Sequence, residues 1–243
     1  EMPDLRFSII PRCAAIYPAL GGRWRGADSC WVFPGGEKIF LSHLQYDSSV
    51  HRYQGAEFQY VAFDELTTFT KYQYTYLFSR IRSSKGVPCR VRGASNPGGD
   101  GHDWVLKRFA PWLYPPWHTD YQGPRAGPGE TLYFLPRSDD SDEEMVVPKG
   151  TRLANGRAFL PSRLEDNPSL GEDYEARLML LDPVTRARLR RGDWLIKPAK
   201  GLYFQRHWWQ FAKSVPHGGM RVRAWDLAAT EPRDKNDPDW TVG

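Results

Sequence analysis

Residues 59–65, with the sequence Gln-Tyr-Val-Ala-Phe-Asp-Glu, constrain the fold of this 243-residue chain more than any other segment. The apolar run predicts a buried parallel strand, and Asp64 and Glu65 would follow at its carboxyl end. Ligands of open α/β sheets bind at this edge. One carboxylate there can hold Mg²⁺, directly or through water, while its neighbour polarises a water for attack on a γ-phosphate. A strand that ends in a solvated Asp-Glu pair is the alternative, and this segment alone does not separate the two.

A second strand-like segment, residues 90–94, ends in a comparable polar tip. Ser95 and Asn96 follow it, and then the chain breaks sharply at Pro-Gly-Gly. Residues 71–82 are compatible with a helix between the two strands, and residues 102–113 predict an amphipathic helix after them. Strands that alternate with helices indicate an α/β fold with a parallel sheet, so the two polar tips should lie side by side.

Composition is that of an ordinary globular protein, with 40% hydrophobic and 26% charged residues. A net charge of +4 suits a nucleic-acid partner but does not establish one. The three cysteines lack CxxC spacing, which favours a reducing compartment over a zinc site or a disulfide framework. Without a long apolar segment or a signal peptide, we expect a soluble, intracellular protein.

The remaining segments predict further elements. Residues 31–41 read as a hairpin around Gly-Gly, and residues 114–156 as a long irregular loop with an acidic run at 139–144. Residues 171–181 and 183–191 predict helices. The second is basic, and its arginines could lie along a phosphate backbone or form a solvated face: Arg186, Arg188, Arg190 and Arg191. A final strand is expected at residues 220–228.

Taken in order, these motifs resemble the large terminase subunit of tailed bacteriophages, the DNA-packaging motor that also cuts concatemeric DNA. Five segments carry the resemblance: Arg52-Tyr53-Gln54-Gly55 before the Asp64-Glu65 strand, Ala94-Ser95-Asn96-Pro97, Phe159 to Asp166-Asn167-Pro168, Gly192-Asp193-Trp194, and Trp225-Asp226-Leu227-Ala228 followed by Asp239-Trp240.

The resemblance implies a P-loop-type parallel-sheet ATPase core over residues 1–160 that lacks its first strand and phosphate loop. A helical linker would occupy residues 161–215, and residues 216–243 would begin an RNase H-like nuclease domain. The motif GxxxxGK[ST] is absent from the chain, and Gly35-Gly36-Glu37-Lys38 has the wrong spacing. Both ends look cut, so we expect this chain alone to be inactive.

The resemblance also assigns roles to single residues. Asp64 would serve Mg²⁺ and ATP, and Glu65 would be the general base. Ser95 and Asn96 would sense the γ-phosphate and relay its loss. For the nuclease, Asp226 would be the first Mg²⁺ or Mn²⁺ ligand and Asp239 a second, the remaining ligands being absent from the chain.

The expected partners are double-stranded DNA, the portal protein, the small terminase subunit and further copies in a ring, in the host cytoplasm and without a membrane. Two rival hypotheses remain open. A helicase-like or translocase ATPase would explain the strand tips but not the Trp225-Asp226 strand. A degenerate, non-catalytic DNA-binding fragment would explain the missing phosphate loop.

Overall fold

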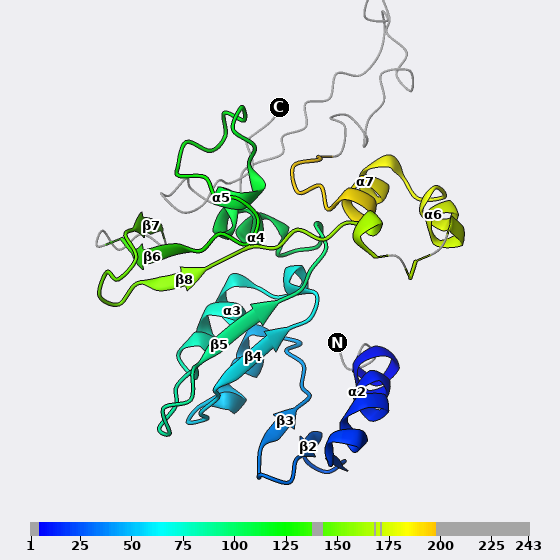
Figure 1. The fold of residues 1–243 in the computed structure, drawn as a ribbon, viewed down its shortest axis with the longest axis vertical. Coiled ribbons are helices and arrows are strands. Elements are labelled where there is room, and N and C mark those ends of the chain that lie inside the picture. Colours follow the sequence, from blue (N-terminus) through cyan, green and yellow to red (C-terminus); the bar gives the residue numbers. More distant parts are fainter. Residues whose placement is uncertain (1–4, 138–142, 168, 171, 198–243) are drawn as a thin grey trace, which may run out of the picture. The chain divides into compact units, whose positions relative to one another are not determined.

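A computed structural model describes residues 5–137, 143–167, 169–170 and 172–197 (Figure 1). All of them belong to one compact unit, Glu1–Lys197. The predicted nuclease strand at residues 220–228, which contains Asp226, lies outside the described residues, and so does Asp239. The nuclease fold and the predicted domain boundaries therefore stay predictions. No helix in the described ranges combines the length and the apolar character that crossing a bilayer requires.

The predicted parallel strand pair is present. Strand β4 (Tyr60–Phe63) pairs in parallel with β5 (Arg90–Gly93), and the two lie side by side in Figure 1. Val61 and Phe63 face the core, whereas Tyr60 is 52% exposed. The expectation of a fully buried strand is therefore wrong. Only one face of the β4–β5 pair is covered by the described residues.

The core joins this covered face to helices before and after it. Its buried members are Phe63, Leu66, Tyr74, Leu77, Val105, Leu106 and Trp194. Trp194 comes from the far end of the described chain. Residues on both sides of position 160, where the sequence predicts a domain boundary, thus share one core.

Helix α3 (Lys71–Phe78) begins at a capping box. The Thr70 hydroxyl accepts a hydrogen bond from the Gln73 backbone N–H at 3.1 Å, and the Gln73 side chain accepts one from the Thr70 N–H at 3.2 Å. The helix stops four residues before the predicted end at Arg82. Arg80 and Arg82 use their backbone groups to pair with Phe58 instead, at 3.0 Å each.

The helix predicted over residues 102–113 is two helices, α4 (His102–Arg108) and α5 (Ala110–Leu113). The break falls at Phe109. Pro111 has no N–H for the bond that a continuous helix would need, and its ring would crowd the preceding turn.

Two antiparallel sheets flank the parallel pair in sequence. The first joins β1 (Arg23–Arg25), β2 (Cys30–Val32) and β3 (Lys38–Phe40), which confirms the predicted hairpin as β2–β3 and adds β1. It follows three short helical segments: η1 (Leu5–Ile9), α2 (Ile10–Ile16) and η2 (Tyr17–Leu20). The 3₁₀ helix η3 (Asp47–Tyr53) connects this sheet to β4.

The second antiparallel sheet corrects the prediction of an irregular loop over residues 114–156. Strand β6 (Leu132–Pro136) lies between β7 (Glu144–Val147) and β8 (Asn155–Arg157). Nor is the whole acidic run solvated. The Glu144 carboxylate accepts two hydrogen bonds from Arg157 Nη2, at 2.8 and 2.7 Å, and pairs with Arg108 Nη1 at 3.0 Å.

The described chain ends in helices. The 3₁₀ turn η5 (Leu164–Asp166) precedes α6 (Glu172–Leu178), which is shorter than predicted, and α7 (Pro183–Arg191), whose predicted bounds are confirmed. Asp182 caps α7 by accepting hydrogen bonds from Val184 and Thr185 N–H at 3.0 Å. Gly192, with φ of 60°, terminates it in the left-handed conformation.

The Glu144–Arg157 pair supplies a test of the second sheet. Because the Arg157 side chain is only 9% exposed, Glu144→Ala leaves a nearly buried charge unpaired. We expect a loss of about 2–4 kcal/mol in the free energy of unfolding, measured by chemical denaturation. The control is Glu143→Ala, which removes exposed pairs with Lys107 and Arg137 and should cost about 0–1 kcal/mol. Equal losses in the two variants would show that the Glu144–Arg157 pair contributes no more to stability than an exposed pair.

Candidate functional site at the strand tips

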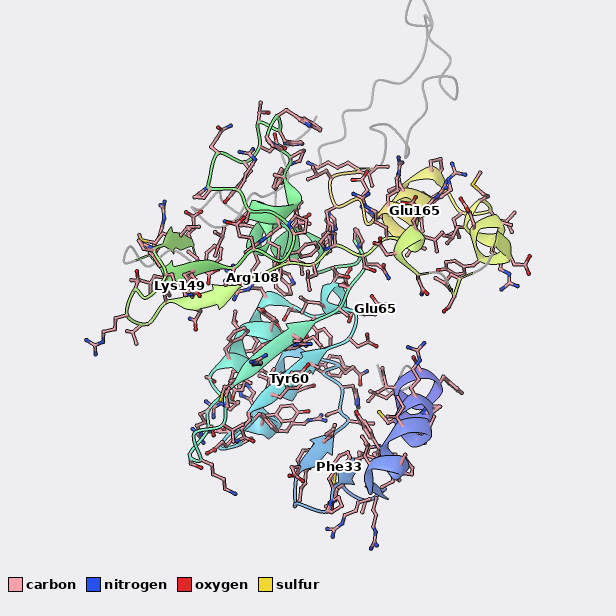
Figure 2. All side chains as sticks on the ribbon, in the orientation of Figure 1. Phe33, Tyr60, Glu65, Arg108, Lys149 and Glu165 are labelled. Atoms are coloured by element: carbon pink, nitrogen blue, oxygen red, sulfur yellow. The ribbon has the colours of Figure 1, made fainter. Side chains whose placement is uncertain are left out.

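The four described residues predicted for the site meet at one edge of the parallel pair. The Ala94 N–H donates to the Phe63 carbonyl at 2.9 Å, and the Leu66 N–H donates to the Ala94 carbonyl at 2.9 Å. The β4–β5 ladder thus continues beyond both strands. Asp64 and Glu65 follow β4 while Ser95 and Asn96 follow β5, as predicted. Figure 2 shows Glu65 beyond the carboxyl end of β4 and Tyr60 at its start.

Glu65 has an unusual backbone. Its φ of 52° and ψ of 61° lie in the left-handed region, which costs a residue with a side chain about 1–2 kcal/mol. The turn is held by the Glu65 carbonyl, which accepts hydrogen bonds at 2.8 Å from both the N–H and the hydroxyl of Thr68. The conformation leaves Asp64 and Glu65 exposed and sends Leu66 into the core. Strained backbone of this kind is concentrated at functional residues.

Gly93 lies directly against the Leu66 side chain. A Cβ atom at Gly93 would stand 2.9 Å from Leu66 Cδ2, closer than two carbon atoms can pack. A residue with a side chain at the end of β5 would displace the tip of the Leu66 side chain, whereas glycine leaves Leu66 undisturbed in the core.

Ser95 joins the two tips through Thr67. Its hydroxyl oxygen accepts a hydrogen bond from the Thr67 N–H at 3.1 Å and lies 3.0 Å from the Thr67 hydroxyl. Both hydroxyls also donate to the Asn96 carbonyl, at 3.1 and 3.2 Å. These contacts position the exposed Asn96. Thr67, which is 4% exposed, was missed in the sequence; a hydroxyl residue two positions after a strand-ending carboxylate is the signal that could have found it.

His102 anchors the loop after Asn96. The Gly98 N–H donates to His102 Nδ1 at 3.0 Å, so this nitrogen carries no proton. Partial burial lowers the pKa of His102 below its usual range, and the neighbouring Arg188 lowers it further, whereas Asp103 opposes the shift. The ring is therefore neutral at neutral pH. No pattern in the sequence around His102 indicates this contact.

The donor set at the tips suits a hard cation. Carboxylate and amide oxygens are the ligands Mg²⁺ takes, and it is held at phosphate sites by one or two carboxylates plus water and phosphate oxygens. Among the described residues no group of three or more His, Cys, Asp or Glu converges. A hollow of about 310 Å³ borders the site, lined by Thr68, Phe69, Asp100 and Trp104 among others, but not by Asp64 or Glu65.

Comparison with known proteins identifies the family. The model of the T4-like large terminase subunit, N-terminal part, matches residues 19–211, and the chain belongs to this family. That membership places it in the DNA-packaging machinery of bacteriophages. The matched residues include both strand tips and α7 but neither Asp226 nor Asp239. No curated protein matches the chain. No solved structure matches it either.

The Ser95–Thr67 contact can be tested by stability. Ser95→Ala leaves the Thr67 N–H, in a buried residue, without its acceptor, so we expect a loss of about 1–3 kcal/mol in the free energy of unfolding. In Thr68→Ala the lost hydroxyl is exposed and water replaces it, so the loss should stay within about 0.5 kcal/mol. Chemical denaturation measures both variants. A Ser95→Ala loss no larger than that of Thr68→Ala would refute the bridging role.

Proposed function

We propose that this chain is the motor part of a large terminase subunit, which couples ATP hydrolysis to the movement of double-stranded DNA into a procapsid. One observation carries the proposal: the Asp64-Glu65 tip of β4 lies beside the Ser95-Asn96 tip of its parallel neighbour, inside the segment that matches the family. This is the edge of an α/β sheet at which ligands bind.

In this proposal the two carboxylates have different roles. Glu65 is the general base that orients the attacking water, and Asp64 is the carboxylate that holds Mg²⁺. The metal would neutralise the charge on the phosphates. The left-handed backbone supports the assignment of Glu65, because it holds a long carboxylate side chain out from the strand end while the following residue anchors the turn in the core.

Asn96 is proposed to sense the γ-phosphate. Its carbonyl is fixed by two hydroxyls while the residue itself stays exposed, so its backbone is held and its amide faces outward. Ser95, predicted as a nucleotide contact, has hydrogen bonds to Thr67 and to the Asn96 carbonyl. We therefore assign it to positioning Asn96.

Replacement of Glu65 tests the catalytic role. In a terminase polypeptide that carries this chain together with a phosphate-binding loop, Glu65→Gln keeps the size of the side chain but removes the base. ATP hydrolysis should fall about 10²–10⁴-fold with nucleotide affinity unchanged, measured by phosphate release and by equilibrium binding. Glu57→Gln, the same change before the amino end of β4, should leave hydrolysis unchanged. Hydrolysis that survives in Glu65→Gln would exclude Glu65 as the base.

DNA cleavage is the second activity we propose, by metal-dependent hydrolysis with Mg²⁺ or Mn²⁺. Its support is the resemblance of Trp225-Asp226 and Asp239-Trp240 to the opening of the family's nuclease domain, in which Asp226 and Asp239 would hold metal. Both residues lie beyond the described part of the chain. A translocase without nuclease activity is the alternative.

DNA is the proposed substrate of movement, gripped through phosphates because a packaging motor must accept any sequence. The portal protein, the small terminase subunit and a ring of copies are the partners that the family implies. Helix α7 remains our proposed DNA surface, with one correction. Arg188 faces the loop after β5, which leaves Arg186, Arg190 and Arg191, with Arg190 ion-paired to Glu175.

The salt dependence of DNA binding tests this surface. Each arginine that contacts a phosphate should contribute about 0.9 to the slope of log K against log salt concentration. We expect the double variant Arg186→Gln/Arg191→Gln to lower that slope by about 1–2 for DNA of any sequence, measured by fluorescence anisotropy across a salt series. The control is Arg152→Gln, an exposed arginine in the turn before β8. An unchanged slope in the double variant would exclude α7 as the DNA surface.

A further inference from the structure

The guanidinium of Arg188, in α7, is partly buried but makes few hydrogen bonds. Among the described residues, its Nε is buried without a hydrogen-bond partner. Its Nη2 reaches the Ile196 carbonyl only at 3.5 Å, the far limit of a hydrogen bond. A guanidinium stays charged in proteins, so poor pairing of this kind at a half-buried position is costly and points to a role other than packing.

The guanidinium lies against the loop that follows Asn96. A Cβ atom built at Gly98 would stand 3.3 Å from Arg188 Nη1 and 3.6 Å from its Cδ. Gly98 and Gly99 have φ values of 113° and 79°, conformations that residues with side chains rarely adopt. The loop thus presents bare backbone to Arg188, and any displacement of Asn96 reaches this contact within two residues.

A second contact joins the same elements. The His102 ring, which accepts the Gly98 N–H, stacks on Trp194 with centroids 5.4 Å apart and planes at 15°. Trp194 is 6% exposed and belongs to the core, just after α7 ends. The loop after β5, the start of α4 and the segment around α7 therefore meet at Gly98.

We propose that Arg188, together with the His102–Trp194 stack, is the positioning contact through which the Asn96 loop and helix α7 move as one. The inference rests on the proposed role of Asn96 as the sensor of the γ-phosphate. Phosphate at the strand tips stabilises the Arg188 cation against the loop, and loss of that negative charge weakens the contact. The chemical state of the nucleotide is thereby passed to the linker helix.

The contact itself is tested without nucleotide, on the 243-residue chain. The charged groups that act on His102 are Arg188 and Lys197, which lower its pKa, and Asp103, which raises it. Arg188→Met should raise the pKa of His102, followed by NMR titration of its ring protons. Arg188→Lys, which keeps the charge, and Arg186→Met, on the same helix, should leave it nearly unchanged. An unaltered pKa in Arg188→Met would overturn the contact.

The relay is tested in the polypeptide that also carries a phosphate-binding loop. Hydrogen exchange of residues 183–191 should be slower with a non-hydrolysable ATP analogue than with ADP. In Arg188→Met this difference should shrink about fivefold or more, while Arg186→Met and Arg188→Lys keep it. A full difference in Arg188→Met would overturn the relay. If the unmodified protein binds no nucleotide, the proposed function fails, whereas the titration still decides the contact.

Discussion

The pairing of β4 with β5, continued past the ends of both strands, is the interaction on which the site depends. Ala94 donates to Phe63 and accepts from Leu66, so one residue after β5 holds the chain on both sides of Asp64 and Glu65. The two carboxylates are exposed, yet the residues around them are held by backbone hydrogen bonds. A reactive tip needs such support, because catalytic geometry tolerates little displacement.

Burial of Leu66 next to this tip offsets the backbone strain at Glu65. Placing the Leu66 side chain in the core contributes about 1.5–3 kcal/mol, against about 1–2 kcal/mol for the left-handed backbone of Glu65. Thr67, also buried, adds the hydrogen bond from its N–H to the Ser95 hydroxyl. The exposed residues are therefore the ones that chemistry would use, and the buried residues directly after them hold the turn in place.

The features that were predicted correctly are those with signals in the local sequence. Strand β4 carries an apolar run, both parallel strands end in polar tips, and α7 carries its own start and stop signals in Asp182, Pro183 and Gly192. The second antiparallel sheet escaped because its determinants are distant in sequence: Glu144 looks like part of a solvated acidic run until Arg108 and Arg157 are brought beside it. The inward turn of Leu66 is hidden for the same reason, since it depends on packing against residues far along the chain such as Val105 and Trp194.

The arginines of helix α7 look equivalent in sequence, but the fold places them in different surroundings. Its arginines read as one basic surface, but the helix sets Arg188 against the Gly98 loop while Arg190 pairs with Glu175 and Arg191 is exposed. A charge that grips DNA has to remain in solvent and exchange counterions, whereas a charge that reports on a phosphate gains strength from partial burial. Two such charges on neighbouring turns of one rigid helix cannot move independently. If both roles hold, a shift of the Asn96 loop would displace the DNA-facing arginines through the helix itself, without any further hinge between them.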